Sequence, residues 1–333
     1  MRPTVELLES MDLGIRFLRP PNGPDAEASH GTPFPEETRA AIDAADASFF
    51  GSSSTSSGRA LMYLRWGKET YANVRPAKYY PGAVTPLAQP DGLDFIIVRE
   101  NLEDLYVGVE GDLDELAGFN RTSRTARRPL SSFGPGKFAV KAITEAGCER
   151  VIRFAFDLAR RRRGQLTVTS KYNMLPVADG LFRDVGLALA SEYPEVNLST
   201  YIIDDFCHRM VRDPHQFDVV VMPNLYGDIM SDGAAALVGG LGMAPSGCYG
   251  DDYAYFESAH GTAPDIAGQN IINPTATILS SAMMLDHLGM TEAARRLEAA
   301  VAAVYRDGQC LTRDQGGSAS TTDFCGAVAE QLK

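Results

Sequence analysis

The chain has 333 residues, against a prior of about 150 residues per domain, so two domains are expected. Its 44% apolar and 22% charged content is typical of a globular protein, and the net charge of −12 disfavours a nucleic-acid-binding protein. No apolar run approaches the ~18 residues of a membrane span, and five dispersed cysteines without a Cys-x-x-Cys pair indicate free thiols in a reducing cytoplasm.

Short apolar runs rich in β-branched residues alternate with helical patterns along the chain. Strands are predicted at 94–98, 165–169, 198–203 and 217–222, and helices at 149–163 and 275–288. Asn273-Pro274 has the order of a helix N-cap followed by a first-turn proline. This alternation predicts an α/β protein with mostly buried strands, whose last third is mainly helical.

Two polar stretches interrupt the pattern. Residues 111–136 carry four arginines among Ser, Thr and Gly, and this stretch is either a solvated loop or an arm that packs on a second subunit. Residues 52–57 (SSSTSS) form a polar loop that acts as a linker or as a mobile lid beside a site.

Carboxylates follow two of the predicted strands. Asp228 and Asp232 are four residues apart at a helix start after strand 217–222, so they share one helix face. Adjacent carboxylates repel unless a cation lies between them, which favours Mg²⁺ or Mn²⁺, and capping of the helix dipole is the alternative. Asp204 follows strand 198–203 as a third ligand, although spacing does not separate it from Asp205.

Basic and phenolic side chains form a second group. Convergence of Arg65, Arg75 and Arg99 would suit a di- or tricarboxylic acid, because guanidinium groups bind carboxylates with two hydrogen bonds. Scattered surface positions are the alternative. Lys171 and Tyr106 each follow a predicted strand and are acid or base candidates, with a structural role as the alternative.

The segment His260 to Asp265 (HGTAPD) is the third group. Its small residues allow close approach to a ligand, and a carboxylate there accepts hydrogen bonds from ribose hydroxyls. No P-loop or G-x-G-x-x-G follows a strand, so a conventional Rossmann pyrophosphate site is not predicted.

Taken in order, these motifs resemble the isocitrate, homoisocitrate and isopropylmalate dehydrogenases, which are metal-dependent β-decarboxylating enzymes. The resemblance runs through DFIIVRENLEDLYVG, TSKYNMLPVADGLF, NLYGDIMSDGAAALVGGLGMAPSG and FESAHGTAPDIAGQNIINPTATILSSAMML. It implies two α/β domains with a large mixed sheet and a projecting dimer arm at about 111–136. Residues 1–70 and 239–333 would form the larger cofactor domain, and 71–238 the smaller substrate and dimerisation domain.

The resemblance also implies a role for each motif residue. Substrate carboxylates would bind Arg65, Arg75 and Arg99, the metal would bind Asp204, Asp228 and Asp232, Tyr106 would be the general acid and Lys171 the catalytic lysine. Lys171 and Asp204 would reach the neighbouring subunit's site, so a cytoplasmic homodimer with shared active sites is expected. The adenosine side of NAD would bind to His260, Gly261, Thr262, Ala263, Pro264, Asp265 and Asn273. The Asp265 carboxylate would repel the 2′-phosphate of NADP.

The implied reaction is NAD-dependent oxidative decarboxylation of a 3-substituted malate to a 2-oxo acid and CO₂. Leu61 and Met62 favour an apolar 3-isopropylmalate pocket, whereas Arg59 and the motifs RENLED and LVGGLGMAPSG favour isocitrate or homoisocitrate. An isocitrate-like acid is preferred, with tartrate or D-malate as further alternatives.

Family members open with a strand and a Gly-Asp-Gly-Ile-Gly-Pro turn that this sequence does not contain. Either the reading frame is shortened or the first strand of the sheet is missing, and a catalytically silent regulatory subunit is the alternative to an enzyme. Intact Tyr106, Lys171 and three aspartates favour the enzyme.

Overall fold

The computed structural model describes residues 1–52, 58–116, 118–119 and 121–333. Its main sheet has the strand order β1-β10-β9-β2-β3-β8-β6-β7. These strands are β1 (Ser48–Phe49), β2 (Ala72–Lys78), β3 (Asp94–Glu100), β6 (Gln165–Ser170), β7 (Asn197–Ile202), β8 (Val219–Met222), β9 (Pro245–Tyr249) and β10 (Ala254–Ser258). Both parallel and antiparallel pairs occur, so the predicted α/β fold with a large mixed sheet is confirmed.

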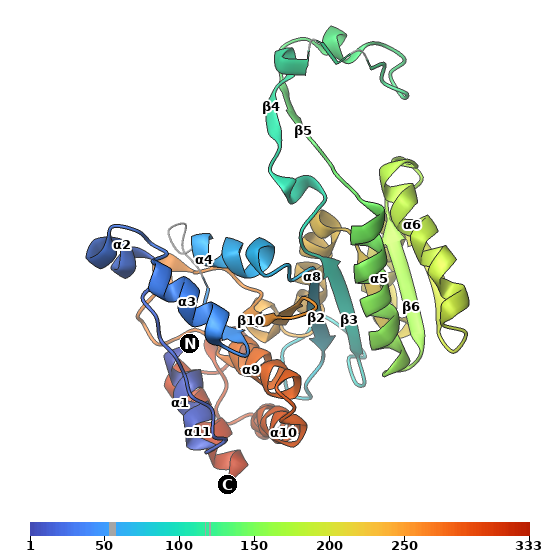
Figure 1. Cartoon of the computed structure of the whole chain (residues 1–333). Helices are drawn as coiled ribbons and strands as arrows, with labels where there is room; N and C mark the ends of the chain where they lie inside the picture. Colours follow the sequence, from blue (N-terminus) through green and yellow to red (C-terminus); the bar gives the residue numbers. More distant parts are fainter. Residues whose placement is uncertain (53–57, 117, 120) are drawn as a thin grey trace.

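Helices cover both faces of this sheet (Figure 1). They are α1 (Arg2–Ser10), α2 (Pro24–His30), α3 (Glu36–Ala44), α4 (Gly58–Met62), α5 (Glu145–Arg160), α6 (Ala178–Leu189), α7 (Ile203–Arg212), α8 (Asn224–Leu237), α9 (Thr275–His287), α10 (Thr291–Asp307) and α11 (Thr321–Leu332). Helix α5 packs on Val219 and Val221, whereas α7 and α8 pack against Val220 and Met222. Successive side chains of β8 therefore serve opposite cores, which explains its continuous apolar sequence.

The four strands predicted from apolar runs are present as β3, β6, β7 and β8. The other four strands of the main sheet, β1, β2, β9 and β10, were not predicted; β1 has only two residues, β2 contains Arg75 and Pro76, and β9 contains Gly247. The last third is mainly helical, as predicted, although β9 and β10 precede α9. Helix α9 begins at Thr275 as predicted and ends at His287, but its N-cap is Pro274 rather than Asn273, although Asn273 Oδ1 accepts from the Thr275 N–H at 3.0 Å.

Residues 111–136 belong to an arm that extends from the body of the molecule (Figure 1). Its root is the antiparallel pair β4 (Glu110–Asp112) and β5 (Lys137–Ala139). The four arginines are exposed, and so are the apolar side chains of Phe119 and Phe133. The arm thus presents a mixed basic and apolar surface that this chain does not cover. Of the polar loop 52–57, residues 53–57 lie outside the described residues.

Candidate active site

The antiparallel register of β2 and β3 places polar side chains on one face of the sheet. Asn73 is opposite Arg99, and Arg75 is opposite Ile97, so Asn73, Arg75 and Arg99 share that face. Arg99 is only 2% exposed and Arg75 8%, in the layer between the sheet and the start of α8. Both guanidinium groups are therefore withdrawn from bulk water.

Three of the predicted site residues converge on Asp228. Arg99 Nη1 pairs with Asp228 Oδ1, Arg75 Nη1 lies 3.4 Å from the same oxygen, and Tyr106 donates to Asp228 Oδ2 at 2.9 Å. Burial and the bond to Asp228 raise the pKa of Tyr106, so it holds its proton at neutral pH. The structure thus brings Arg75, Arg99, Tyr106 and Asp228 together in one cluster.

The start of α8 is shaped to approach β3 closely. A Cβ at Gly227 would lie 2.5 Å from Arg99 Cβ, so only glycine fits there. Asn224 Oδ1 accepts from both Arg99 Nε at 2.9 Å and Nη2 at 2.7 Å, and Ser231 accepts from Arg75 Nη1 at 2.7 Å. These two side chains hold the arginines in place, and sequence reasoning missed both of them.

Arg65 lies in a π-helical turn, Tyr63–Gly67, beside the same cluster. Its guanidinium lies over the Trp66 ring at 5.5 Å, and its buried Nε has no hydrogen-bond partner among the described residues. Burial, followed by the charges of Arg75 and Arg65, outweighs the attraction of Asp228 and lowers the pKa of Arg99 to about 10. Three guanidinium groups and the carboxylates of Asp228, Asp232 and Glu257 therefore share the cluster, and the mutual repulsion of the guanidinium groups suits an anionic ligand.

Asp228 and Asp232 fit one half of a divalent metal site. Arg75 Nη1 lies 3.6 Å from Asp232 Oδ1 and 3.4 Å from Asp228 Oδ1, so the two carboxylates face the same point. Burial, together with the charge of Asp228, raises the pKa of Asp232. Within the described ranges, no three His, Cys, Asp or Glu side chains are grouped so as to hold a metal. A complete site therefore requires a ligand from outside this cluster.

The remaining predicted catalytic residues form a separate pair. Lys171 Nζ pairs with Asp204, whereas Asp205 pairs with Arg209 on its own helix at 3.0 Å. The structure thus places Asp204, rather than Asp205, beside the lysine. Asp204 is 57% exposed, and in the described part of the chain no hydrogen bond or ion pair joins this pair to Asp228.

The residues predicted to contact the variable group lie on the short helix α4, ahead of Arg65. Arg59 and Met62 are exposed, whereas Leu61 packs beside Leu64 and Tyr255. The exposed arginine and methionine are available to a ligand, while much of Leu61 is used in packing.

The predicted cofactor loop is exposed and follows β10. His260 hydrogen-bonds through Nδ1 to Ser52 Oγ at 3.2 Å, and its buried Nε2 has no partner within the described residues. Asp265 is exposed in the turn Pro264–Ile266, while Ala263 has a φ of +42°. Asn273 instead turns inward and donates to Asp314 at 2.9 Å. A partly exposed loop whose imidazole Nε2 and Asp265 carboxylate have no partner among the described residues fits a polar cofactor.

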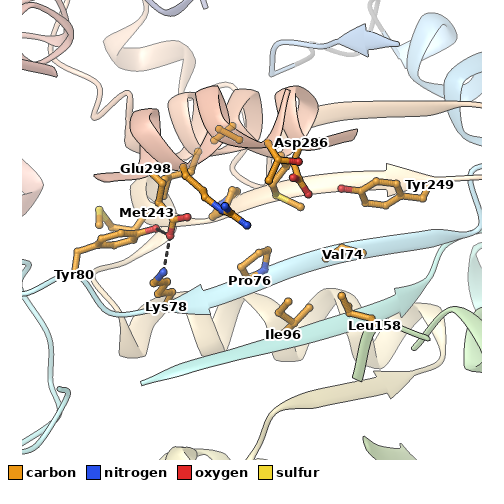
Figure 2. A pocket seen from close by; sticks show the side chains of 17 residues that line it. Val74, Pro76, Lys78, Tyr80, Ile96, Leu158, Met243, Tyr249, Asp286 and Glu298 are labelled. Atoms are coloured by element: carbon orange, nitrogen blue, oxygen red, sulfur yellow. Dashed lines mark hydrogen bonds and ion pairs between the residues drawn. The ribbon is translucent and has the colours of Figure 1, made fainter. Parts of the chain in front are cut away.

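A cavity lies on the opposite face of the sheet. Its volume is about 430 Å³, and Val74, Pro76 and Ile96 line it together with α9 and α10 (Figure 2). Lys78 Nζ forms an ion pair with Glu298 there at 2.6 Å, and none of the predicted site residues borders it. Alternation along β2 explains the separation, because even-numbered residues face this cavity and odd-numbered residues face Asp228.

Known proteins resemble this chain along nearly its full length. The family model described as isocitrate/isopropylmalate dehydrogenase matches residues 3–328. A 3-isopropylmalate/3-methylmalate dehydrogenase of Methanocaldococcus jannaschii is 41% identical over 99% of this chain and 94% of its own. An isocitrate/homoisocitrate dehydrogenase of Thermus thermophilus is 42% identical, over 98% and 92% respectively. The crystal structure of isocitrate dehydrogenase from Methylococcus capsulatus superposes with a TM-score of 0.85 at 35% identity, covering 99% and 94%.

Proposed function

Because the chain belongs to the isocitrate/isopropylmalate dehydrogenase family, we propose that it oxidatively decarboxylates a 3-substituted malate, with NAD as the hydride acceptor. The family makes it a dehydrogenase of the β-decarboxylating type. An isocitrate-like acid is the proposed substrate. The observation that carries this proposal is the convergence of Arg75, Arg99 and Tyr106 on Asp228.

The closeness of three guanidinium groups at this cluster supports an acid with several carboxylates. Arg75 and Arg99 would each bind substrate carboxylate oxygens, while Asn224 and Ser231 hold the two guanidinium groups in orientation. Exposed Arg59 would reach a distal carboxylate, which supports isocitrate or homoisocitrate over 3-isopropylmalate. The names of the relatives include both types of substrate.

Proton transfers are assigned to two residues. Lys171 would take the proton of the C2 hydroxyl, and Tyr106, whose raised pKa keeps it protonated, would deliver a proton to C3 after CO₂ leaves. When bound, Mg²⁺ or Mn²⁺ would stabilise negative charge on the substrate oxygens, and NAD⁺ would accept the hydride. Asp228 and Asp232 would hold the metal from this chain, with Asp204 as the third carboxylate.

We propose that the active site is shared between two copies of the chain. Lys171 and Asp204 pair with each other apart from Asp228, so a second copy would contribute them to the site. The arm at 111–136 would cover the partner, which would bury its exposed Phe119 and Phe133. The proposal divides the chain into a cofactor domain (1–70 and 239–333) and a substrate and dimerisation domain (71–238).

The exposed loop His260 to Asp265 would bind the adenosine part of NAD. Asp265 has no ion-pair partner in the described part of the chain, so its carboxylate is available to both ribose hydroxyls and would repel a 2′-phosphate. The inward orientation of the Asn273 side chain leaves only its backbone to this role.

The test is reduction of NAD⁺ or NADP⁺ with isocitrate, homoisocitrate, 3-isopropylmalate, D-malate or tartrate, with Mg²⁺ or Mn²⁺ and after chelation. We expect the highest kcat/KM with isocitrate or homoisocitrate and NAD⁺, and loss of turnover on chelation. Turnover of 3-isopropylmalate alone would correct the substrate, and a preference for NADP⁺ would correct the cofactor. Absence of turnover with every acid would favour a catalytically silent subunit.

A further inference from the structure

Lys141 lies at the root of the arm, directly after β5, and is almost enclosed. Its side chain is 14% exposed, and Nζ lies 2.6 Å from Asp179 Oδ1 and 3.2 Å from Asp104 Oδ1. Both carboxylates are fully buried. The ammonium also lies 4.5 Å from the centre of the Tyr226 ring. One cation therefore contacts three separate segments of the chain.

The first of these segments carries Tyr106. Asp104 stands two residues before it and adopts a left-handed backbone, with φ of +72°. Its backbone N–H donates to Ala142 O at 2.8 Å, and its Oδ2 accepts from the Leu225 N–H at 2.9 Å. Asp104 thus connects the tyrosine loop with the root of the arm and with the start of α8.

The other two segments carry Lys171 and Asp228. Asp179 Oδ2 accepts from the backbone N–H of Lys171 at 2.7 Å, so this carboxylate holds the lysine loop directly. Tyr226 stands two residues before Asp228 on α8. Two of the residues that Lys141 contacts, Asp104 and Tyr226, therefore stand two positions before a proposed catalytic or metal-binding residue. The third, Asp179, bonds the backbone of Lys171.

Lys141 is the charge that allows the three segments to meet. Two buried carboxylates at one point repel each other and lose their hydration, and a buried cation with good geometry offsets both costs. Removing that cation leaves two negative charges in the protein interior, so the segments would separate or the carboxylates would take up protons.

We propose that Lys141 is a positioning residue that holds the loops of Tyr106 and Asp228 in one proposed active site and the loop of Lys171, which this chain would contribute to the partner's site. This inference rests on the proposed function. Arg75 and Arg99 are held by the sheet, Asn224 and Ser231, and they make no contact with Lys141. Loss of Lys141 should therefore impair the proton transfers far more than the binding of the acid.

The test compares Lys141→Met and Lys141→Arg with Lys78→Met. Lys78 is a matched control, because it also forms a 2.6 Å ion pair with a carboxylate and lies 5.7 Å from a tyrosine ring, on the opposite face of the sheet (Figure 2). We expect Lys141→Met to lower kcat about 100-fold and to change KM for the acid less than about threefold. Lys141→Arg should recover most of kcat, and Lys78→Met should keep both values.

Hydrogen–deuterium exchange supplies a readout that does not depend on activity. In Lys141→Met, peptides covering 101–107, 170–180 and 223–228 should all exchange about tenfold faster, while the same peptides are unchanged in Lys78→Met. If Lys141→Met does not fold, Asp179→Asn replaces it, since this variant keeps an oxygen for the Lys171 N–H but removes a charge that Lys141 neutralises.

Unchanged kcat, or faster exchange in only one of the three segments, would overturn the proposal. A rise in KM without a fall in kcat would overturn it as well, because that result would assign Lys141 to substrate binding. If the unmodified protein turns over none of the acids, the proposed function fails, and the exchange of the three segments alone decides whether Lys141 holds them together.

Discussion

The two ends of strands β3, β6 and β8 carry the same residue types but differ in how their charges are balanced. At the amino ends, the fully buried Asp218 accepts from Arg162 Nε at 2.8 Å and from the Arg163 N–H at 2.9 Å. Arg162 also donates to Asp94 at 2.9 Å. Every charge at this end faces an opposite charge or a backbone donor.

At the carboxyl ends, guanidinium groups lie close enough to repel one another. Arg75 and Arg99 share Asp228, and burial together with the charge of Arg75 lowers the pKa of Arg99 to about 10. Arrangements of this kind cost stability unless an anion binds. The amino ends thus use arginine and aspartate to hold the sheet together, whereas the carboxyl ends hold the same groups ready for a ligand.

The largest effect on kcat should come from variants of the carboxyl-end site, which we propose that two chains share. Lys171→Met and Asp228→Asn should each lower kcat at least about 1,000-fold. A co-expressed equimolar mixture should recover about a quarter of the wild-type activity, because half of the dimers are mixed and each mixed dimer has one intact site of two. Steady-state turnover of the separate and mixed variants measures this, and no recovery would place the site within one chain.

The amino-end cluster should affect stability without affecting catalysis. Arg162→Met removes the nearer of the two cations of buried Asp218 and leaves Arg163 at 3.8 Å, so the free energy of unfolding should fall by about 3 kcal/mol. The value of kcat/KM at a temperature where the variant is folded should not change. Chemical denaturation and turnover measured on the same preparation test this pair of outcomes, and a parallel loss of kcat/KM would remove the distinction between the two ends.

Glu100 supplies a pH test at the carboxyl end. Burial raises the pKa of Glu100 to about 7 from an ordinary 4.5. The N–H groups of Leu102 and Glu103, which donate to its carboxylate at 2.8 and 2.9 Å, lower the pKa but do not outweigh burial. The folded state therefore binds this proton more tightly, and its contribution to stability is complete below pH 4.5 and lost as the pH rises through 7. Between those limits the unfolding free energy, relative to Glu100→Gln, should fall by at most about 3 kcal/mol. A flat difference in denaturant titrations would contradict this.

The smallest effect should come from one substrate arginine. Arg75→Met removes a charged hydrogen-bond donor worth about 2 kcal/mol, so KM for the acid should rise about 30-fold. Thermal stability should hold or increase, because the mutual repulsion of Arg75 and Arg99 is relieved. Kinetics and a melting curve together check this, and a lowered Tm with unchanged KM would assign Arg75 to structure.

Much of the fold and of the cluster around Asp228 could be predicted from local sequence. A strand that is buried on both faces requires a run of apolar β-branched residues, so β3 and β8 could be predicted. Strand β2 lacks such a run, because it contains Arg75 and Pro76 and is held by its pairing with β3 and β9. The helix spacing of Asp228 and Asp232 is likewise a local property, and α8 confirms it.

Residues whose partners are distant in sequence could not be predicted. Asn224 matters because it meets Arg99, which lies on another strand, and Lys141 because two buried carboxylates face it. Spacing alone could not separate Asp204 from Asp205, since only the position of Lys171 distinguishes them. The alternation of side chains along β2 was the one available signal that Asn73 and Arg75 lie on the same face of the sheet.

The sheet also joins the two proposed domains in one hydrogen-bonded layer. Strand β2 pairs with β9 over three residues and with β3 over seven, so the junction is continuous but narrow. Movement of one half against the other must twist these few hydrogen bonds, which makes opening elastic and limited in amplitude. Asn73 lies within the junction and bonds both Ser246, at 2.9 Å, and Arg75, at 3.4 Å. Any such twist would therefore shift Arg75, which we propose to bind the substrate.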